Sequence, residues 1–477
     1  MQAEVAGNYI DEKAATITAV SNRIWALAEV GLHEEQSAQY LADALRTEGF
    51  DVRLGAGGMP SGLEATWGEG RPVIGFLGEY DALPGVSQKA LPLREELSPG
   101  SAGHGCGHNL LGAGAFGAVI GLKREMEARG LTGTIKYFGC PAEENFGGKA
   151  HMAREGLFTA CDACLTWHPG PLNFVRSAAS LAVDSMNVTF RGRTAHAAAD
   201  PHNGRSALDA VQLMNLGVEF LREHMPAKAR VHYVITNGGG QPNVVPATAT
   251  VWYYVRAPQR GMVDELYQRV IRCARGAAEM TETECDIELL DAIWELLPNT
   301  TLEKVLAECM ARVGPPRFGE AEREFARKLS ESFRPGQREA FLAAAFEGAA
   351  AVPEELGGQL LNDTVVPRVE AAAQPRGSTD VGDTSWCCPT AQFGMACSAI
   401  GTPGHSWQFA AQSGMGIGHA GMLQAAKVLA EAGLVLLTDP ATLAAAREEF
   451  ARRTGGKAYR CAMPDGFKPP FHQLANK

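Results

Sequence analysis

The sequence lacks the features that mark a secreted or membrane-spanning protein. Its N-terminal stretch, MQAEVAGNYIDEKAATITAV, contains neither a basic segment nor the apolar segment of a signal peptide. No later run of about 18 apolar residues indicates a membrane span. The eleven cysteines are an odd number for a disulfide framework, and most are expected to be reduced packing residues. These absences predict a cytoplasmic protein.

Blocks of one charge are also missing. The 43 basic and 54 acidic residues give a net charge of -11, spread along the chain. Such a balance favours solubility and argues against nucleic acid or an anionic membrane as the main partner. With 477 residues, of which 45% are hydrophobic, the chain is long enough to form at least two domains with ordinary cores.

Helical and extended segments alternate in the first part of the chain. Apolar residues at helical spacing predict helices over residues 12–28, 36–48 and 110–126. Strands are predicted over residues 73–77, 134–139 and 163–167, with a short helix before the last one. Four glycines in the third helix indicate close packing against a neighbour. This alternation predicts an α/β fold with a largely parallel sheet, whose carboxyl ends carry the functional residues.

The pattern changes over residues 182–295, which we expect to form a separate inserted domain. The expected order is strand 182–191, helix 205–224, strands 231–236 and 248–256, helix 262–280 and strand 284–290. This is the β-α-β-β-α-β order of a ferredoxin-like unit. Residues 1–181 and 296–477 then form the other domain. Within it, the helical segment at about 315–361 has no catalytic signature, and we expect either a surface excursion or a cap over a substrate or partner surface.

Possible metal ligands follow several of the predicted strands. They lie in the segments GEYDALPG (Asp81), GHGCGHN (His104, Cys106, His108), CPAEEN (Glu143, Glu144), TWHPG (His168) and TPGHSW (His405). Each of them alone is also explained as an ordinary loop residue. Together, thiolate, imidazole and carboxylate groups at the carboxyl ends of one sheet predict a site for a borderline-soft divalent metal.

The adjacent glutamates suit a hydrolase. One carboxylate can bind metal while its neighbour accepts a proton from water whose pKa the metal lowers. Asp81 is expected to lie behind a ligand, where it would hold an imidazole in the right tautomer. His104 is expected to support the loop without binding metal.

A set of motifs resembles the di-metal aminoacylase and carboxypeptidase family, in its amidohydrolase branch. The resemblance covers nearly the whole chain and rests on DALPG, GHGCGHN, PAEE, WHP, GRTAHAA with GRSALDA, PNVVPA and GSTDVGDTSW. It implies an α/β catalytic domain with a mixed, mostly parallel sheet. This domain is interrupted by a ferredoxin-like lid that also serves for dimerisation.

The resemblance also implies roles for individual residues. Two divalent ions, manganese or zinc, would be bound by Cys106, His108, Glu144, His168 and His405, with Cys106 as a bridge. Glu143 would be the general base. His196 would reach from the lid of a partner subunit to stabilise the oxyanion. Asn243 and Arg256 would hold the substrate carboxylate, a task that suits the planar guanidinium.

The activity implied is hydrolysis of the amide bond of an N-acyl amino acid. An aroyl-glutamate such as p-aminobenzoyl-glutamate is the expected substrate, with a place in folate catabolism. The alternatives are a broader aminoacylase or dipeptidase, and a partner subunit of a hetero-oligomeric hydrolase. The expected assembly is a homodimer through the lid, or a complex with a related companion subunit, without nucleic acid or membrane.

The sequence departs from the family pattern at two places. Glu79-Tyr80-Asp81 stands where many relatives have His-x-Asp, so we expect Cys106 and His108 to supply more of the metal ligands. Asn109 stands where much of the branch has Asp. The metal therefore stays open, because a thiolate favours zinc whereas the branch is similar to manganese enzymes.

Two further motifs are expected to be structural. Cys161 and Cys164 have C-x-x-C spacing but adjoin a buried strand, so packing is the better interpretation. The segment NGGGQ, residues 237–241, lacks the spacing of a phosphate-binding loop and is expected to be a turn.

Overall fold

The computed structural model describes residues 2–175, 179–347, 349, 351–368 and 377–471. By its internal contacts the chain divides into two compact units. The first unit comprises Met1–Ala178, Leu297–Gln374 and Asp383–Cys461. The second comprises Ala179–Leu296, Pro375–Gly382 and Ala462–Lys477. Each unit has its own hydrophobic core.

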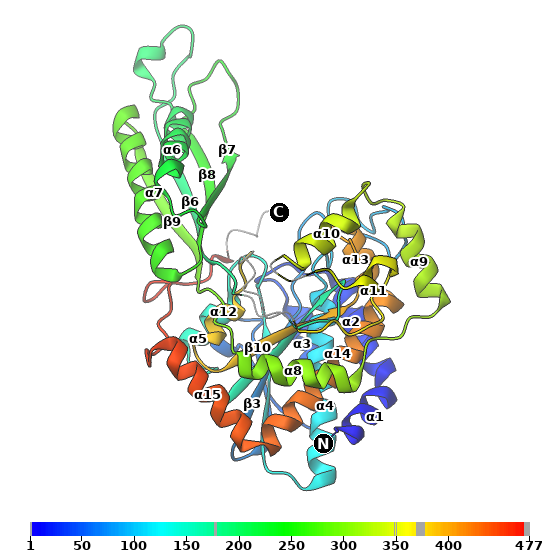
Figure 1. The fold of residues 1–477 in the computed structure, drawn as a ribbon. Coiled ribbons are helices and arrows are strands. Elements are labelled where there is room, and N and C mark those ends of the chain that lie inside the picture. The colour runs from blue at the N-terminus through cyan, green and yellow to red at the C-terminus, as the bar shows by residue number, and fades with distance from the viewer. Residues whose placement is uncertain (1, 176–178, 348, 350, 369–376, 472–477) are drawn as a thin grey trace. The chain divides into compact units, whose positions relative to one another are not determined.

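The first unit is built on a six-stranded sheet with the order β1-β2-β4-β3-β5-β10 (Figure 1). Its strands are β1 (Asp51–Leu54), β2 (Leu63–Glu69), β3 (Val73–Glu79), β4 (Gly133–Cys140), β5 (Ala163–Gly170) and β10 (Thr390–Ala396). β4, β3, β5 and β10 pair in parallel, and β2 is antiparallel to both of its neighbours. The predicted mixed, mostly parallel sheet is therefore confirmed. Our prediction missed β1 and β2, because β1 has only four residues and too few apolar positions to show a period.

Helices surround this sheet in the first unit. They are α1 (Glu4–Glu12), α2 (Ala14–Leu27), α3 (Glu35–Thr47), α4 (His108–Arg129), α5 (Gly148–Arg154), α8 (Thr300–Val313), α13 (Trp407–Ser413), α14 (Gly416–Thr438) and α15 (Pro440–Thr454). A short helix, α12 (Val381–Ser385), lies where the chain passes from one unit to the other. α4 packs against α14, α1 and α2 and against strand β3.

The glycines of α4 allow this close packing. A Cβ atom at Gly112 would lie 2.5 Å from the carbonyl oxygen of Glu79, and one at Gly114 would lie 2.7 Å from the ring of Trp167. Real Cβ atoms do not come this close to other atoms, so only glycine fits. The expected close contact is confirmed, and it brings the start of α4 against the ends of β3 and β5.

α14 is the one helix among the described residues that is long and apolar enough to cross a membrane. Its most apolar window has a mean hydropathy of 1.5. Two thirds of that window, 67%, is buried within the protein. The helix contacts α4, α8 and strands β5 and β10, so its apolar character is that of a core helix.

The helical segment at 315–361 contains α9 (Glu320–Ser330), α10 (Gln337–Ala345) and α11 (Glu354–Gly358), and its residues 348 and 350 lie outside the described part. Leu342 and Phe346 pack with Ile400, which follows β10. The side-chain amide of Gln337 donates a hydrogen bond of 2.8 Å to the carbonyl oxygen of Gly401. The segment therefore packs against the loop that leads to His405.

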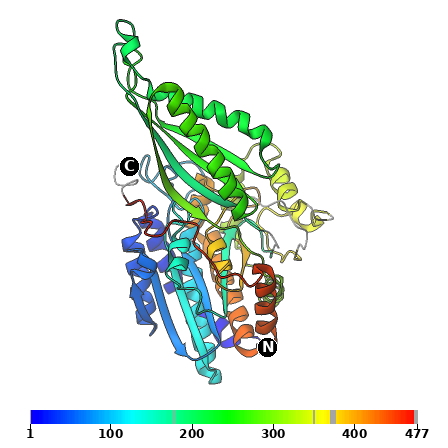
Figure 2. The same ribbon diagram turned by 90° about the vertical axis from the view of Figure 1, so that its left-hand side faces the viewer.

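The second unit is a four-stranded antiparallel sheet with the order β7-β8-β6-β9. Its elements are β6 (Ala182–Arg191), α6 (Ala207–Leu221), β7 (Arg230–Asn237), β8 (Thr248–Ala257), α7 (Arg260–Thr281) and β9 (Glu284–Ile293). The two helices lie side by side on one face of this sheet (Figure 2). Element order and strand order are those of the predicted ferredoxin-like unit.

Candidate metal centre

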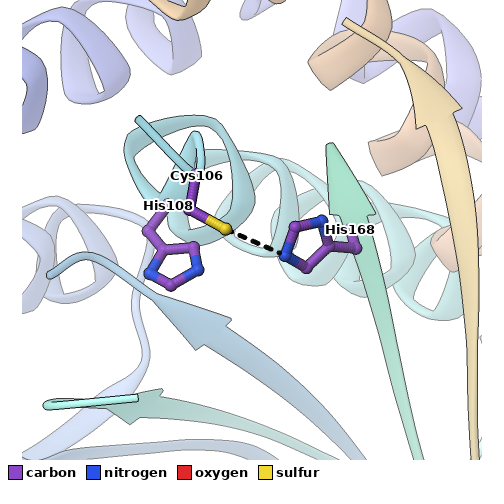
Figure 3. Close-up of side chains that lie close together, drawn as sticks. All are labelled: Cys106, His108 and His168. Carbon is purple, nitrogen blue, oxygen red and sulfur yellow. Dashed lines mark hydrogen bonds between the residues drawn. The ribbon is translucent and has the colours of Figure 1, made fainter. Parts of the chain in front are cut away.

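The carboxyl ends of the parallel strands bring the predicted ligands together. β3 ends at Glu79, two residues before Asp81, and β4 ends at Cys140, just before Glu143. His168 lies within β5, near its end, and α4 begins at His108. Figure 3 shows Cys106, His108 and His168 converging from the start of α4 and from β5. Residues that are far apart in the sequence thus form a cluster, because the parallel strands that carry them end at one edge of the sheet.

The donor atoms form three overlapping groups, each with all its atoms within 4.8 Å of one another. The groups are Cys106, His108 and His168; Cys106, Glu144 and His405; and Glu79, His108 and Glu143. Within the first group, Sγ of Cys106 lies 3.4 Å from Nε2 of His168. All five ligands predicted from the resemblance therefore come together. Glu79, which the sequence did not predict as a ligand, joins them.

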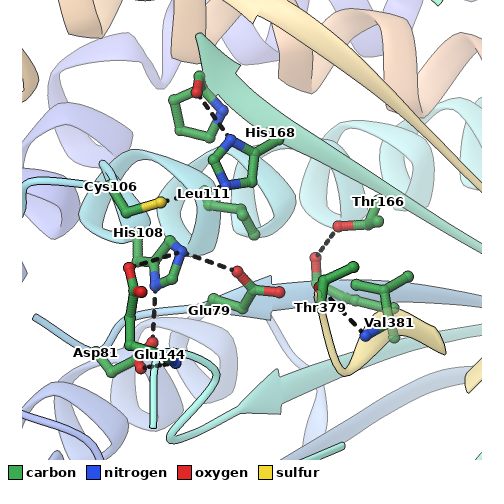
Figure 4. A network of polar contacts seen from close by, with 12 residues as sticks. Glu79, Asp81, Cys106, His108, Leu111, Glu144, Thr166, His168, Thr379 and Val381 are labelled. Atoms are coloured by element: carbon green, nitrogen blue, oxygen red, sulfur yellow. Dashed lines mark hydrogen bonds and ion pairs between the residues drawn. The ribbon is translucent and has the colours of Figure 1, made fainter. Parts of the chain in front are cut away.

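Asp81 fixes the imidazole of His108. Its Oδ1 lies 2.7 Å from Nδ1 of His108, and both side chains are fully buried. Its other oxygen accepts a hydrogen bond of 2.9 Å from the backbone N–H of Glu144. One carboxylate therefore orients two of the predicted ligands and turns Nε2 of His108 toward the cluster (Figure 4).

The residues present fit a metal centre. Nε2 of His108 and Oε1 of Glu144 are buried without a hydrogen-bond partner among the described atoms. Buried polar atoms without partners are rare in folded proteins and call for an ion or water. Burial raises the pKa of the Cys106 thiol, so this sulfur needs a nearby cation to become a thiolate. Burial would lower the pKa of His108, but Cys106, Asp81 and Glu79 raise it well above its ordinary value.

Two residues lie at the open side of the cluster. His405 has a side chain that is 60% exposed, and its Nε2 lies 3.5 Å from Oε2 of Glu144. Its backbone N–H donates to the carbonyl oxygen of Gly105 at 3.0 Å, which ties its loop to the Cys106 loop. Glu143 is half-buried, with a carboxylate oxygen close to Glu79 and His108. Partial exposure leaves room for a substrate at these two side chains.

Other polar residues near the cluster have structural partners. Nε2 of the buried His104 lies 3.0 Å from the carbonyl oxygen of Ile24, which agrees with a supporting role. Burial lowers the pKa of His104 to about 4. The amide of Asn109 donates to Oγ of Ser21 and to the carbonyl oxygen of Ser413, both at 2.9 Å. Asn109 therefore joins helices of the core and takes no place in the donor groups.

All eleven cysteines lie in the described part of the chain, and none forms a disulfide. Cys161 and Cys164 are buried at 7% and 0% exposure, as expected for packing residues.

Two residues that support the cluster were not predicted from the sequence. Lys149 on α5 is fully buried and its Nζ lies 2.6 Å from Oε1 of Glu79. Oε1 of the buried Glu34 accepts a hydrogen bond of 2.7 Å from the backbone N–H of Ala142. Ala142 has a φ of 57°, a left-handed conformation that alanine rarely adopts. The sequence offers no local signal for either contact.

The residues predicted to bind substrate lie in the second unit. His196 is exposed, and its Nδ1 accepts hydrogen bonds from the backbone N–H groups of Ala198 and Ala199, at 3.3 and 3.2 Å. Nδ1 is then an acceptor, so in the neutral ring the proton sits on Nε2, where it is available to donate. Asn243 is exposed as well, and its carbonyl oxygen accepts from Ala197 at 3.0 Å.

Arg256 projects from β8 with spare hydrogen-bonding capacity. Its Nη1 donates to Oγ of Ser378 at 3.0 Å and its guanidinium lies 5.0 Å from the ring centre of Tyr254. Its Nε is buried without a partner, and no carboxylate among the described residues forms an ion pair with it. Burial lowers the pKa of Arg256. A half-buried guanidinium without a counter-ion is suited to bind an anionic group.

Known proteins resemble the chain in sequence. Residues 182–280 match the M20 peptidase dimerisation domain. One of the two subunits of the p-aminobenzoyl-glutamate hydrolase of Escherichia coli K12 is 41% identical over 458 residues, which is 95% of each chain. The chain belongs to the M20 metallopeptidase family. As a member of this family it is a hydrolase of amide bonds. A mouse relative, an Xaa-Arg dipeptidase, is 28% identical over 93% of this chain and 91% of its own length.

Solved structures of two other proteins share the fold. An aminobenzoyl-glutamate utilization protein from Klebsiella pneumoniae superposes with a TM-score of 0.61 at 20% identity, covering 90% of this chain and 97% of the other. A dinuclear metal-binding peptidase of the M20 family from Bacillus subtilis gives a TM-score of 0.56 at 17% identity, with 90% and 99% covered. The fold class expected from the sequence is therefore that of the M20 family.

Proposed function

We propose that this M20 chain hydrolyses the amide bond of an N-acyl amino acid, with p-aminobenzoyl-glutamate as the substrate and a place in folate catabolism. The observation that carries the proposal is the convergence of Cys106, His108, Glu144, His168 and His405 at one edge of the sheet. The substrate is supported by the 41% identity with one chain of a p-aminobenzoyl-glutamate hydrolase over nearly the whole length.

Two divalent ions, manganese or zinc, would be held by these five side chains, with Cys106 common to two of the three donor groups. When bound, such ions lower the pKa of water and polarise a carbonyl group. The donors include a thiol and three imidazoles, which favours zinc, whereas the carboxylate of Glu144 also suits manganese.

Glu143 would act as the general base. Its carboxylate lies beside the ligands but is half-buried, so one oxygen can face a substrate. It would accept a proton from the attacking water and then give this proton to the nitrogen of the leaving amine. Asp81 would keep His108 and Glu144 in position during this transfer.

Residues of the lid would recognise the amino-acid part of the substrate. Arg256 and Asn243 would hold the carboxylate, since Arg256 has no acidic partner among the described residues. His196 would donate from Nε2 to the oxyanion that forms when the amide carbon becomes tetrahedral. We assign the lid to residues 182–295 and the catalytic domain to residues 1–181 and 296–477.

The lid would also form a homodimer. β7 is an edge strand of its sheet, and Tyr233, Val234 and Ile235 on it are 38%, 55% and 40% exposed. On α6, Leu216 and Phe220 are 52% and 70% exposed. An exposed apolar edge strand is a site for pairing with a second copy of the chain. In such a dimer His196 would serve the active site of the partner.

A companion chain is the alternative assembly. The Escherichia coli hydrolase is named as an enzyme of two different subunits, and its second one is 28% identical over 57% of this chain. The other alternative is a broader aminoacylase or dipeptidase, supported by the Xaa-Arg dipeptidase relatives. We place the enzyme in the cytoplasm, acting on a small molecule without nucleic acid or membrane.

Assay of the purified chain alone tests this proposal. Metal-free protein is supplied with manganese or zinc, and release of p-aminobenzoate is followed beside a panel of acyl and aroyl amino acids. Turnover of p-aminobenzoyl-glutamate above the other substrates supports the proposal. Faster turnover of dipeptides supports the broader enzyme, and activity that requires an added companion supports the hetero-oligomer.

A further inference from the structure

Glu79 and His108 direct a carboxylate oxygen and a ring nitrogen at each other. Because Asp81 binds Nδ1 of His108, the neutral ring carries its proton there and has a lone pair on Nε2. Oε2 of Glu79 lies 3.2 Å from this Nε2, and both side chains are buried. Nε2 has no hydrogen-bond partner among the described atoms, so the contact is not a well-aligned N–H to carboxylate bond. Two buried atoms of this kind need a cation between them, which is either a second proton on His108 or a metal ion in its place.

The distance fits two ligands of one metal ion. Donor atoms at about 2.1 Å from an ion, at angles between 90° and tetrahedral, are roughly 3.0–3.4 Å apart and lie off each other's axis. The 3.2 Å between Glu79 and His108 falls in this range, and a poor hydrogen-bond angle is what such a pair would show. Glu143 offers a third donor atom, a carboxylate oxygen, and the three donor atoms lie within 4.8 Å of one another.

Lys149 forms an ion pair with the other carboxylate oxygen of Glu79, Oε1. Its Nζ lies 2.6 Å from Oε1, and both side chains are almost completely buried. This ion pair fixes the rotation of the carboxylate and leaves Oε2 facing the cluster. A basic residue that holds one oxygen of a ligand carboxylate is a common second layer of a metal site.

We propose that Glu79 is itself a metal ligand, which binds through Oε2 the ion held by Nε2 of His108, while Lys149 orients it through Oε1. This inference rests on the two-metal centre of the proposed function and adds a sixth side chain to it. The rival explanation is that Glu79 and Lys149 form an ion pair that only supports the fold around β3 and α5.

Two substitutions separate these explanations, because Glu79→Gln weakens metal binding much more than Lys149→Met only if Glu79 is a ligand. In Glu79→Gln, the amide oxygen stays with Lys149 and the NH2 group is turned toward Nε2 of His108, where it blocks the ion. We expect one of two ions to bind at least about 100-fold more weakly, beyond the 10- to 100-fold effect typical of groups behind a ligand. In Lys149→Met, Glu79 keeps its charge and both oxygens but loses the group that orients it, so we expect metal binding to weaken by about tenfold at most, clearly less than in Glu79→Gln.

Calorimetric titration of metal-free protein with Mn²⁺ and with Zn²⁺ measures both affinities and the number of ions. Cobalt-loaded protein gives a second readout, since loss of a ligand changes its visible absorption. An equal loss of metal affinity in both variants would show that the ion pair only supports the fold, and this would overturn the inference. Unchanged metal binding in Glu79→Gln would also overturn it. If Glu79→Gln fails to fold with Lys149 unpaired, the double variant Glu79→Gln with Lys149→Met removes that charge and should still lose one ion. Retention of both ions by the double variant would likewise overturn the inference.

These results are independent of the proposed reaction. If the wild type binds two ions and hydrolyses its substrate while Glu79→Gln binds metal unchanged, only the inference about Glu79 is wrong. If the wild type binds no ions, the proposed two-metal centre is wrong.

Discussion

Asp81 and His108 form a buried pair in which Oδ1 of the carboxylate lies 2.7 Å from Nδ1 of the imidazole. The pair links the end of β3 to the first residue of α4, and the same carboxylate accepts the backbone N–H of Glu144. The tautomer of one ligand and the position of another therefore depend on a single acidic side chain.

Asp81→Asn should reduce metal affinity and kcat by about 10- to 100-fold each. The amide keeps the size of the carboxylate but no longer stabilises a proton on Nδ1 of His108, so the ring loses its preferred tautomer. Metal titration and steady-state kinetics measure the two effects. Asp43→Asn, at an exposed aspartate of α3, is the matched control and should change neither. Wild-type affinity in Asp81→Asn would show that the orientation of His108 does not depend on this bond.

Glu34 is expected to position the loop that carries Glu143. It binds the N–H of the left-handed Ala142 through Oε1 and the hydroxyl of Ser61 through Oε2. Glu34→Leu should lower kcat by roughly tenfold or more, since a displaced catalytic group costs rate even when the fold persists. Glu34→Gln keeps an acceptor for the Ala142 amide and should keep most of the activity.

A second change tests the same contact at Glu34. Ala142→Gly makes the left-handed conformation easy to adopt, so it should restore part of the kcat lost in Glu34→Leu. Kinetics of the four combinations give the coupling between the two positions. Strictly additive effects, or equal losses in Glu34→Gln and Glu34→Leu, would contradict a positioning role.

Glu449 is expected to stabilise the start of α8 in a pH-dependent way. Its carboxylate accepts the backbone N–H groups of Thr300 and Thr301, both at 2.9 Å, and both threonine hydroxyls. Burial would raise the pKa of Glu449, but these hydrogen bonds lower it to about 2. A lowered pKa in the folded state means that the stabilisation is complete above the ordinary value of 4.5 and is lost as the pH falls toward 2.

Glu449→Gln should therefore lower the free energy of unfolding at pH 7 by about 1.5–3 kcal/mol. The difference in free energy of unfolding between this variant and the wild type should become smaller below pH 4.5, the ordinary pKa of the group. Urea unfolding at a series of pH values measures this gap. Glu448→Gln, at the exposed neighbour on α15, should have little effect at any pH. A gap that stays constant down to the acid limit of folding would contradict the assignment.

His196 is expected to act in the site of its dimer partner. His196→Ala and Glu143→Gln homodimers should each be nearly inactive. After exchange of chains between them, roughly a quarter of wild-type activity should return, because half of the dimers are hybrids and each hybrid has one intact site. Size-exclusion chromatography with differently tagged chains verifies the exchange. Complete exchange without recovered activity would place His196 in the site of its own chain or outside the reaction.

Much of the fold and most of the metal donors could be predicted from the sequence, because they depend on local patterns. The lid showed its full β-α-β-β-α-β order, since each of its strands and helices has a clear apolar period. Cys106 and His108 are separated by a single residue. The other donors follow predicted strands, and the parallel pairing of these strands brings the donors together.

The remaining features arise from contacts between distant segments. Lys149, in the stretch GGKAHMAR, has the sequence of an exposed helix, and only its packing beneath the end of β3 makes it a buried partner of Glu79. The left-handed Ala142 is likewise invisible without Glu34, which comes from a distant part of the chain. The short helix α1 and the four-residue β1 have too few apolar positions to show a clear period.

The central claim is that one glutamate of the pair transfers protons while its neighbour binds metal. Measuring metal content and turnover together in Glu143→Gln and Glu144→Gln tests it most directly. We expect Glu143→Gln to bind two ions like the wild type but to lose about 10²- to 10⁴-fold in kcat, and Glu144→Gln to lose metal as well as activity. Undiminished turnover in Glu143→Gln, or full metal content in Glu144→Gln, would contradict the account.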